Sequence, residues 1–189
     1  NNKNINNAIY KTEIDYLDII PSNSKLAGAE IELVSMFTRE TILKQIIQNI
    51  MGKYKYIIID CPPSLGLLTI NALTASNSII IPIQCEYYAL DGLSQLLNTI
   101  RLVQKNLNSH LEIEGILITM FDSRLNLSQQ VLKEVQDYFG DKVYKTLINR
   151  NVKLGEAPSH GKPIILYDAS STGSQNYMNL VSEILHNND

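Results

Sequence analysis

One stretch of the chain reads Tyr56-Ile57-Ile58-Ile59-Asp60-Cys61-Pro62-Pro63-Ser64-Leu65-Gly66. Its three consecutive isoleucines are β-branched and favour a strand that is buried on both faces, as in a parallel sheet covered by helices. The two prolines lack a backbone N–H donor, so the hydrogen-bond ladder should end there. We therefore expect Asp60 at the carboxyl end of a central strand, the edge where open α/β sheets bind ligands. An acid in this place either holds Mg²⁺, directly or through water, or only caps the next turn.

On either side of this stretch, strand patterns alternate with helix patterns. Further strands are expected at residues 16–20, 78–83, 115–120, 143–148 and 164–167, with a loop at 149–163. Helices are expected at 26–50, 67–75, 89–107, 126–139 and 172–186 from the spacing of apolar residues. The first of these helices should bury Ile31, Val34, Leu43, Ile46, Ile47 and Ile50. With right-handed crossovers, the alternation predicts an α/β fold with a mostly parallel, doubly wound sheet flanked by helices.

Composition narrows the class of protein. The chain has 189 residues, of which 44% are hydrophobic and 19% charged, as in an ordinary soluble globular domain. The net charge of −3 means that nucleic-acid binding would need a local basic patch. The two cysteines form no metal-ligand spacing or disulfide framework, which indicates a reducing, cytoplasmic interior. We find no signal peptide and no apolar run long enough to span a bilayer.

The N-terminal region differs from the rest of the chain. The chain starts with Asn, and five of its first seven residues are Asn. We expect residues 1–15 to be a polar linker or a truncated N-terminal region, and residues 16–189 to form one nucleotide-binding domain that is incomplete.

Four segments, taken together and in order, resemble the ParA/Soj chromosome- and plasmid-partition ATPases of the wider ParA/MinD family of deviant-Walker P-loop proteins. They read IIIDCPPSLG at 57–66, IPIQCEYYAL at 81–90, TMFDSR at 119–124 and NRNVKLGEAPSHGKP at 149–163. The first resembles the family's Walker B and switch II segment. The resemblance runs from about Ile14 to the end of the chain. It implies Mg²⁺-dependent ATP hydrolysis, a nucleotide-gated homodimer that binds DNA non-specifically, a ParB-type partner that stimulates hydrolysis, and a cytoplasmic, nucleoid-associated protein.

The resemblance also implies roles for individual residues. Asp60 would be the catalytic carboxylate that holds Mg²⁺ through water. The switch segment would comprise Cys61, Pro62, Pro63, Ser64 and Gly66, stiff at its prolines and flexible at its glycine. Gln84 and Glu86 would contact the nucleotide or the facing subunit, or lie in a solvated loop. Adenine contacts are expected from Met120, Phe121, Asn149, Arg150 and Asn151, although the first two could equally be core residues. Arg124 and Lys153 would contact DNA phosphates, the alternative being that both are merely solvated.

Two motifs of the family do not occur in these 189 residues. One is the phosphate loop Lys-Gly-Gly-x-Gly-Lys-Thr, whose backbone N–H groups and lysines grip the phosphates. The other is the acidic segment Asp-x-Asp-Pro-Gln-Gly-Asn. Residues 155–162 are no substitute for the phosphate loop, because Pro163 stands where a Ser or Thr must bind the metal. We therefore expect a chain without its first strand and phosphate loop, which does not hydrolyse ATP alone.

Two other functions stay open at this point. The chain could be a non-catalytic interaction module that retains the dimer or partner surface. It could also be a MinD-like positioning ATPase, which usually carries a C-terminal amphipathic membrane helix. Residues 177–186 contain no Lys or Arg, which argues against a membrane-surface helix. A hydrolase built on Ser159, His160 and Glu156 is disfavoured, because no nucleophile elbow is present.

Overall fold

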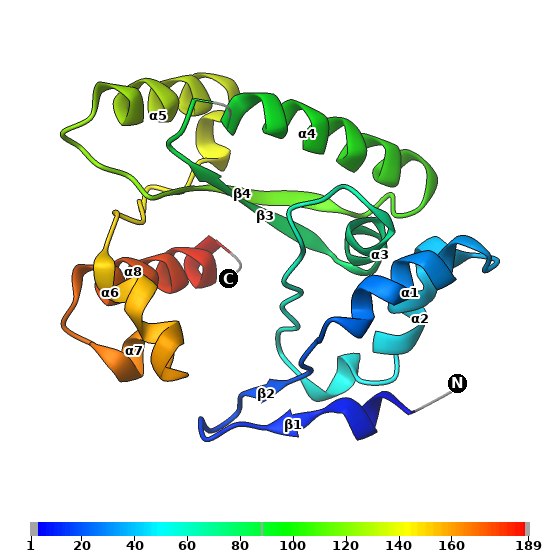
Figure 1. The fold of residues 1–189 in the computed structure, drawn as a ribbon. Helices are drawn as coiled ribbons and strands as arrows, with labels where there is room; N and C mark the ends of the chain where they lie inside the picture. The colour runs from blue at the N-terminus through cyan, green and yellow to red at the C-terminus, as the bar shows by residue number, and fades with distance from the viewer. Residues whose placement is uncertain (1–3, 88, 188–189) are drawn as a thin grey trace. The chain divides into compact units, whose positions relative to one another are not determined.

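The computed structural model describes residues 4–87 and 89–187 (Figure 1). The chain forms two compact units. The first comprises the residues up to 77 together with 96–111, and the second comprises 78–95 together with 112–189. No helix among the described residues is long and apolar enough to cross a membrane.

The first unit is mainly helical. Its strands β1 (Tyr10–Lys11) and β2 (Asp18–Ile19) form a short antiparallel pair. Its helical elements are η1 (Ile5–Ala8), α1 (Lys25–Val34), η2 (Arg39–Thr41), α2 (Ile42–Ile47), η3 (Met51–Lys53), α3 (Leu67–Ala75) and the part of α4 (Ala89–Asn106) from residue 96 on. The short β2 lies within the strand predicted at 16–20, and α3 confirms the helix predicted at 67–75.

The single helix predicted at 26–50 is wrong, because the chain breaks between α1 and α2. Thr38 adopts a left-handed backbone conformation, with φ of 53°, which no continuous helix can accommodate. The apolar positions on the two sides of the break therefore do not form one buried face. Ile47 and Ile50 are buried as predicted, and Leu43 is half-buried, but Ile31, Val34 and Ile46 are exposed.

The strand predicted at 56–60 is also absent from the structure. The segment is irregular backbone between η3 and α3, and Ile58 is 92% exposed (Figure 1). A strand exists through its hydrogen bonds to a neighbouring strand. Within the described part of the chain no strand pairs with residues 56–60, so their β propensity alone does not make them one.

The second unit is built on a parallel pair of strands, β3 (Ser78–Gln84) and β4 (Glu112–Thr119). Its helical elements are the first part of α4 (Ala89–Asn106), α5 (Asn126–Phe139), η4 (Gly140–Lys142), α6 (Val152–Glu156), η5 (Ala157–His160), α7 (Ile164–Tyr167) and α8 (Thr172–Asn187). In Figure 1, α5 and α8 lie on opposite faces of the strand pair. The fold is thus α/β, with a parallel sheet and flanking helices. The predictions for β3, β4, α4, α5 and α8 are confirmed, with α5 matching residue for residue.

The strand predicted at 143–148 does not form, and only isolated bridges remain at Val143 and at the adjoining Asn149. Val143 pairs with Ile116, and Asn149 pairs with Phe121, as isolated parallel bridges. Between them, the backbone N–H groups of residues 145 and 146 donate to the carboxylate of Glu183 on α8, at 2.7 and 3.0 Å. Because these donors go to a side chain, the ladder along β4 is interrupted.

Between residues 149 and 167, where the sequence predicted a loop and a strand, the structure has three short helical elements, α6, η5 and α7. Asn151 caps α6, since its side chain accepts from the N–H of Lys153 at 2.8 Å. Residues 164–167 form α7 instead of a strand, because the N–H groups of Leu166 and Tyr167 both donate to the carbonyl of Pro163. Local turn hydrogen bonds therefore prevail over the apolar, strand-like composition of this segment.

Candidate functional site

The carboxyl ends of β3 and β4 bring several of the predicted nucleotide contacts together. Gln84 ends β3, and Met120 and Phe121 follow β4 directly. The N–H of Phe121 donates to the carbonyl of Ile148 at 3.1 Å, and the N–H of Arg150 donates to the carbonyl of Phe121 at 2.9 Å. Residues 120–121 and 149–150 thus lie side by side at one edge of the sheet.

Met120 and Phe121 differ in what they offer to a ligand. The side chain of Phe121 is only 7% exposed and belongs to the core. Met120 has a left-handed backbone, with φ of 54°, and an exposed side chain. A left-handed conformation is uncommon for a residue other than glycine and often marks a functional turn. Of the two apolar residues, Met120 is therefore the one whose side chain can meet a base.

The polar residues at this edge are partly engaged with each other. The Nη2 atom of Arg150 lies 3.9 Å from Oε1 of Glu86, and both side chains are largely exposed. An exposed pair at this distance contributes little stability, so a bound anion could replace the carboxylate. The N–H of Asn149 donates to Oδ1 of Asn176 on α8 at 3.2 Å, which fixes the backbone beside Arg150. Asn151 uses its side-chain oxygen as the cap of α6.

Arg124, a predicted DNA contact, is held by Asp122. Its Nε and Nη2 donate to the two carboxylate oxygens at 2.9 and 2.7 Å, and its backbone N–H donates to Oδ1 at 3.1 Å. These bonds lower the pKa of Asp122 to about 2 and raise the pKa of Arg124. The side chain of Arg124 nevertheless remains exposed to solvent. The guanidinium is thus oriented and accessible, with one carboxylate as its competitor for phosphate.

Lys153, the second predicted DNA contact, is also paired with an acid. Its Nζ lies 2.9 Å from Oε2 of Glu156, one turn further along, and the hydroxyl of Tyr167 donates to the same oxygen at 3.0 Å. The hydrogen bond from Lys153 is the main reason that the pKa of Glu156 is lowered. The ring of His160 stacks on Tyr167 with centroids 5.0 Å apart. This cluster joins α6, η5 and α7 through their side chains.

Asp122 was not singled out from the sequence as functional, and Glu156 was considered only as the acid of a disfavoured hydrolase site, although a signal for each pairing was present. An Asp two residues before an Arg can accept from its backbone in a turn. A Glu three residues after a Lys lies on the same face of a helix. Each acid forms an ion pair with one of the two predicted DNA contacts.

The predicted switch residues lie in the first unit. Asp60, Cys61, Pro62, Pro63 and Ser64 are all exposed in irregular backbone, and Gly66 is the N-cap of α3. Among the described residues, no group of three or more His, Cys, Asp or Glu side chains lies together in a way that could hold a metal ion. A single exposed carboxylate fits the usual binding of Mg²⁺, which keeps several waters and takes its other ligands from phosphates.

Comparison with known proteins identifies the family. The family model described as AAA domain matches residues 1–113. The chain is 63% identical over 179 residues to the sporulation initiation inhibitor protein Soj of Bacillus subtilis, covering 95% of this chain and 71% of Soj. It is 52% identical over 185 residues to the chromosome partitioning protein ParA of Myxococcus xanthus, covering 98% of this chain and 65% of that protein.

A solved structure of a differently named protein shares the fold of this chain. Cobyrinic acid a,c-diamide synthase from Mycobacterium smegmatis, with bound ATP analog and magnesium, superposes with a TM-score of 0.81 at 34% identity. The alignment covers 97% of this chain and 68% of the synthase. On the strength of its sequence identity to Soj and ParA, the chain belongs to the Soj/ParA family of chromosome-partitioning ATPases of the P-loop type.

Proposed function

We propose that this protein partitions DNA through an ATP- and Mg²⁺-dependent homodimer that binds DNA non-specifically on the nucleoid. A ParB-type partner stimulates hydrolysis and releases the dimer. The observation that carries this proposal is the 63% identity to Soj over 95% of the chain. The supporting geometry is the exposed, oriented Arg124 and the cluster of predicted nucleotide contacts at the carboxyl ends of β3 and β4.

In this proposal the nucleotide-binding residues divide into two groups. The exposed side chain of Met120 and the Asn149–Asn151 backbone and side chains contact adenine, while Gln84 and Glu86 contact the nucleotide or the facing subunit. Asp60 holds Mg²⁺ through water, and the ion neutralises phosphate charge when it is bound. The switch residues 61–66 respond to the γ-phosphate, and their exposed, irregular backbone is compatible with a segment that changes conformation.

The first test of the proposal is binding to duplex DNA by the protein as encoded by its gene. With ATP and Mg²⁺ present, Arg124→Ala should weaken DNA binding about tenfold at low salt, because a cation is lost. The slope of the logarithm of affinity against the logarithm of salt concentration should fall by about one, which corresponds to one phosphate contact. Arg101→Ala, at an exposed position on α4 in the first unit, is the matched control and should bind like the wild type. The DNA-binding role of Arg124 fails if Arg124→Ala binds as tightly as the wild type.

ATP hydrolysis by residues 1–189 alone is a separate question. Phosphate binding in P-loop proteins depends on several charge-assisted hydrogen bonds, each contributing roughly 1.5–3 kcal/mol. The 189 residues contain no Lys-Gly-Gly-x-Gly-Lys-Thr loop to make them. We expect no phosphate release above background from these residues by themselves. Steady release that is abolished by Asp60→Ala would contradict this.

A further inference from the structure

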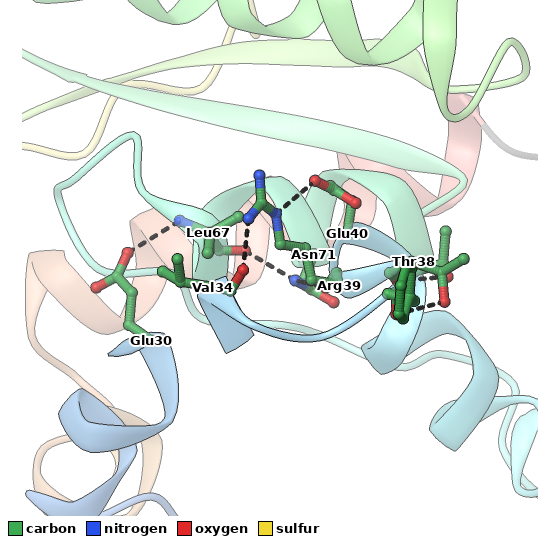
Figure 2. A network of polar contacts seen from close by, with 9 residues as sticks. Glu30, Val34, Thr38, Arg39, Glu40, Leu67 and Asn71 are labelled. Carbon is green, nitrogen blue, oxygen red and sulfur yellow. Dashed lines mark hydrogen bonds and ion pairs between the residues drawn. The ribbon is translucent and has the colours of Figure 1, made fainter. Parts of the chain in front are cut away.

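The first residue of the helix that follows the switch residues is hydrogen-bonded to a carboxylate that lies far away in the sequence. Helix α3 starts at Leu67, and its N-cap, Gly66, has no side chain with which to cap it. Instead, Oε1 of Glu30 on α1 accepts from the N–H of Leu67 at 2.9 Å (Figure 2). A carboxylate is favourable at this end of a helix, where unpaired N–H groups carry partial positive charge.

Gly66 is adapted to this contact. A Cβ atom added at Gly66 would collide with Oε1 of Glu30. Its backbone, with φ of −77° and ψ of −173°, is an extended conformation that any residue can adopt. Glycine at position 66 therefore leaves room for the carboxylate of Glu30, and a larger residue there would push the flexible end of that side chain away from Leu67.

A second set of hydrogen bonds holds α3 further along. Asn71 is only 4% exposed, and its Nδ2 donates to the carbonyls of Arg39 and Leu67 at 2.8 and 2.9 Å. Its Oδ1 accepts from the N–H of Leu43 at 3.1 Å. Arg39 in turn donates to the carbonyl of Val34, the last residue of α1, at 2.7 Å. Figure 2 shows Glu30, Val34, Arg39, Leu67 and Asn71 of this network, which joins α1, η2 and α3, and the bond from Leu43 adds α2.

We propose that Glu30 is a positioning residue for the switch segment. Its carboxylate fixes the first residue of α3, and with it the end of residues 60–66, to α1, while Gly66 leaves the space that the carboxylate needs. A displacement of the end of the switch segment must then either break the bond between Glu30 and Leu67 or move α1 with it. The positioning role rests on the proposed function of residues 61–66 as a switch, but the contact itself does not.

Amide hydrogen exchange tests the contact. Glu30→Ala should accelerate exchange at the N–H of Leu67 about tenfold, because its acceptor is lost. Glu30→Gln retains an acceptor oxygen and should restore most of the protection. Glu32→Ala, two residues away on the same helix and exposed, is the matched control. The proposal is overturned if Glu30→Ala and Glu32→Ala give the same exchange rate at Leu67.

A double-mutant cycle tests the role assigned to Gly66. Gly66→Ala should lower the denaturation midpoint in the wild type, because its Cβ displaces the carboxylate of Glu30 from Leu67, and should lower it less in the Glu30→Ala background, where that bond is already absent. Strictly additive effects would contradict the proposal. If Gly66→Ala alone does not fold, folding of the Glu30→Ala/Gly66→Ala double variant supports the proposal. The exchange rate at the N–H of Leu67 in Glu30→Ala then remains the deciding measurement.

The link to the switch needs nucleotide and the protein as encoded by its gene. On addition of ATP and Mg²⁺, the wild type should change its exchange both at residues 60–66 and along α1, whereas Glu30→Ala should change it at 60–66 only. An ATP response at 60–66 that reaches α1 equally in Glu30→Ala overturns the positioning role alone. No ATP response at 60–66 in the wild type contradicts the proposed switch function itself, whatever the exchange at Leu67.

Discussion

Arg124 and Lys153, the two cations predicted to contact DNA, each lie against a carboxylate of their own local segment. Surface ion pairs of this kind contribute little to stability, since water and salt screen them. Their effect is instead to orient the cation and to compete with phosphate for it. The strength of DNA binding should therefore depend on Asp122 and Glu156 as well as on the cations.

Neutralising Asp122 should strengthen DNA binding. Asp122→Asn retains an oxygen that can accept from the backbone N–H of Arg124 but removes the negative charge that competes with phosphate. We expect duplex DNA affinity at low salt to rise roughly two- to fivefold, as judged from the strength of exposed pairs. Titration of fluorescent DNA with the protein as encoded by its gene measures this, with Arg124→Ala as the reference. Weaker binding by Asp122→Asn would show that the carboxylate supports the contact.

The carboxyl group of Asp122 should titrate with a pKa of about 2 because it accepts hydrogen bonds from Arg124. A lowered pKa means that the folded state favours the charged form, so its contribution to stability is complete above the usual value of 3.8 and is lost as the pH falls through about 2. Carbon-detected NMR of the side chain measures the midpoint. In Arg124→Ala the pKa should return towards 3.8. An unchanged midpoint in that variant would exclude Arg124 as the cause.

Tyr144 is buried, and its hydroxyl has no hydrogen-bond partner among the described residues. Burial, helped by the charges of Glu114 and Glu183, raises the pKa of its phenol to about 12. Burying a hydroxyl that has no hydrogen-bond partner lowers the stability of the folded state, so Tyr144→Phe should raise the free energy of unfolding by about 1 kcal/mol. Denaturant titration measures this, with the exposed Tyr138 changed to Phe as the control. A loss of stability in Tyr144→Phe would mean that the hydroxyl is bonded in solution.

At the scale of elements, the helices whose ends have a local sequence signal could be predicted. Departures from the predicted elements could not, such as a strand whose backbone donors bond to a distant residue. Helix α3 begins after Gly66 and α5 ends before Gly140, and both match their predicted bounds. The segment 143–148 does not form its predicted strand, because Glu183, more than thirty residues away, takes its backbone donors. The single helix predicted at 26–50 is divided near Thr38, and no proline or glycine at that position indicates the break.

The packing of α3 on η2 and α2 should depend on Asn71. Asn71→Ala leaves the N–H of Leu43 and the carbonyl of Arg39 without this partner. We expect the free energy of unfolding to fall by about 2–4 kcal/mol, from the usual cost of lost buried hydrogen bonds. Asn98→Ala, exposed on α4, is the control for helix propensity and should not destabilise the protein. Equal stability of the two variants would exclude the network as a support of α3.

At the scale of the whole molecule, large apolar side chains are exposed in the first unit. Ile58 is 92% exposed and Phe37 97% exposed. Exposed apolar surface of this kind favours association. Residues 1–189 by themselves should therefore bind a hydrophobic dye and self-associate with rising concentration, as measured by light scattering. A double variant, Phe37→Ser with Ile58→Thr, should reduce both, and a monodisperse monomer with one cooperative thermal transition would contradict the prediction.

The sequence by itself determined the family, the order of the main helices and strands, and the residues expected at the nucleotide and DNA contacts. It could do so because motifs and apolar spacing are local properties of the chain. Only the tertiary structure decided that residues 56–60 are not a strand, that residues 145–146 bond to Glu183, and that Glu30 caps α3. The reason is physical: a strand requires a neighbouring strand, and a hydrogen bond between residues far apart in sequence exists only once packing has brought its two atoms together.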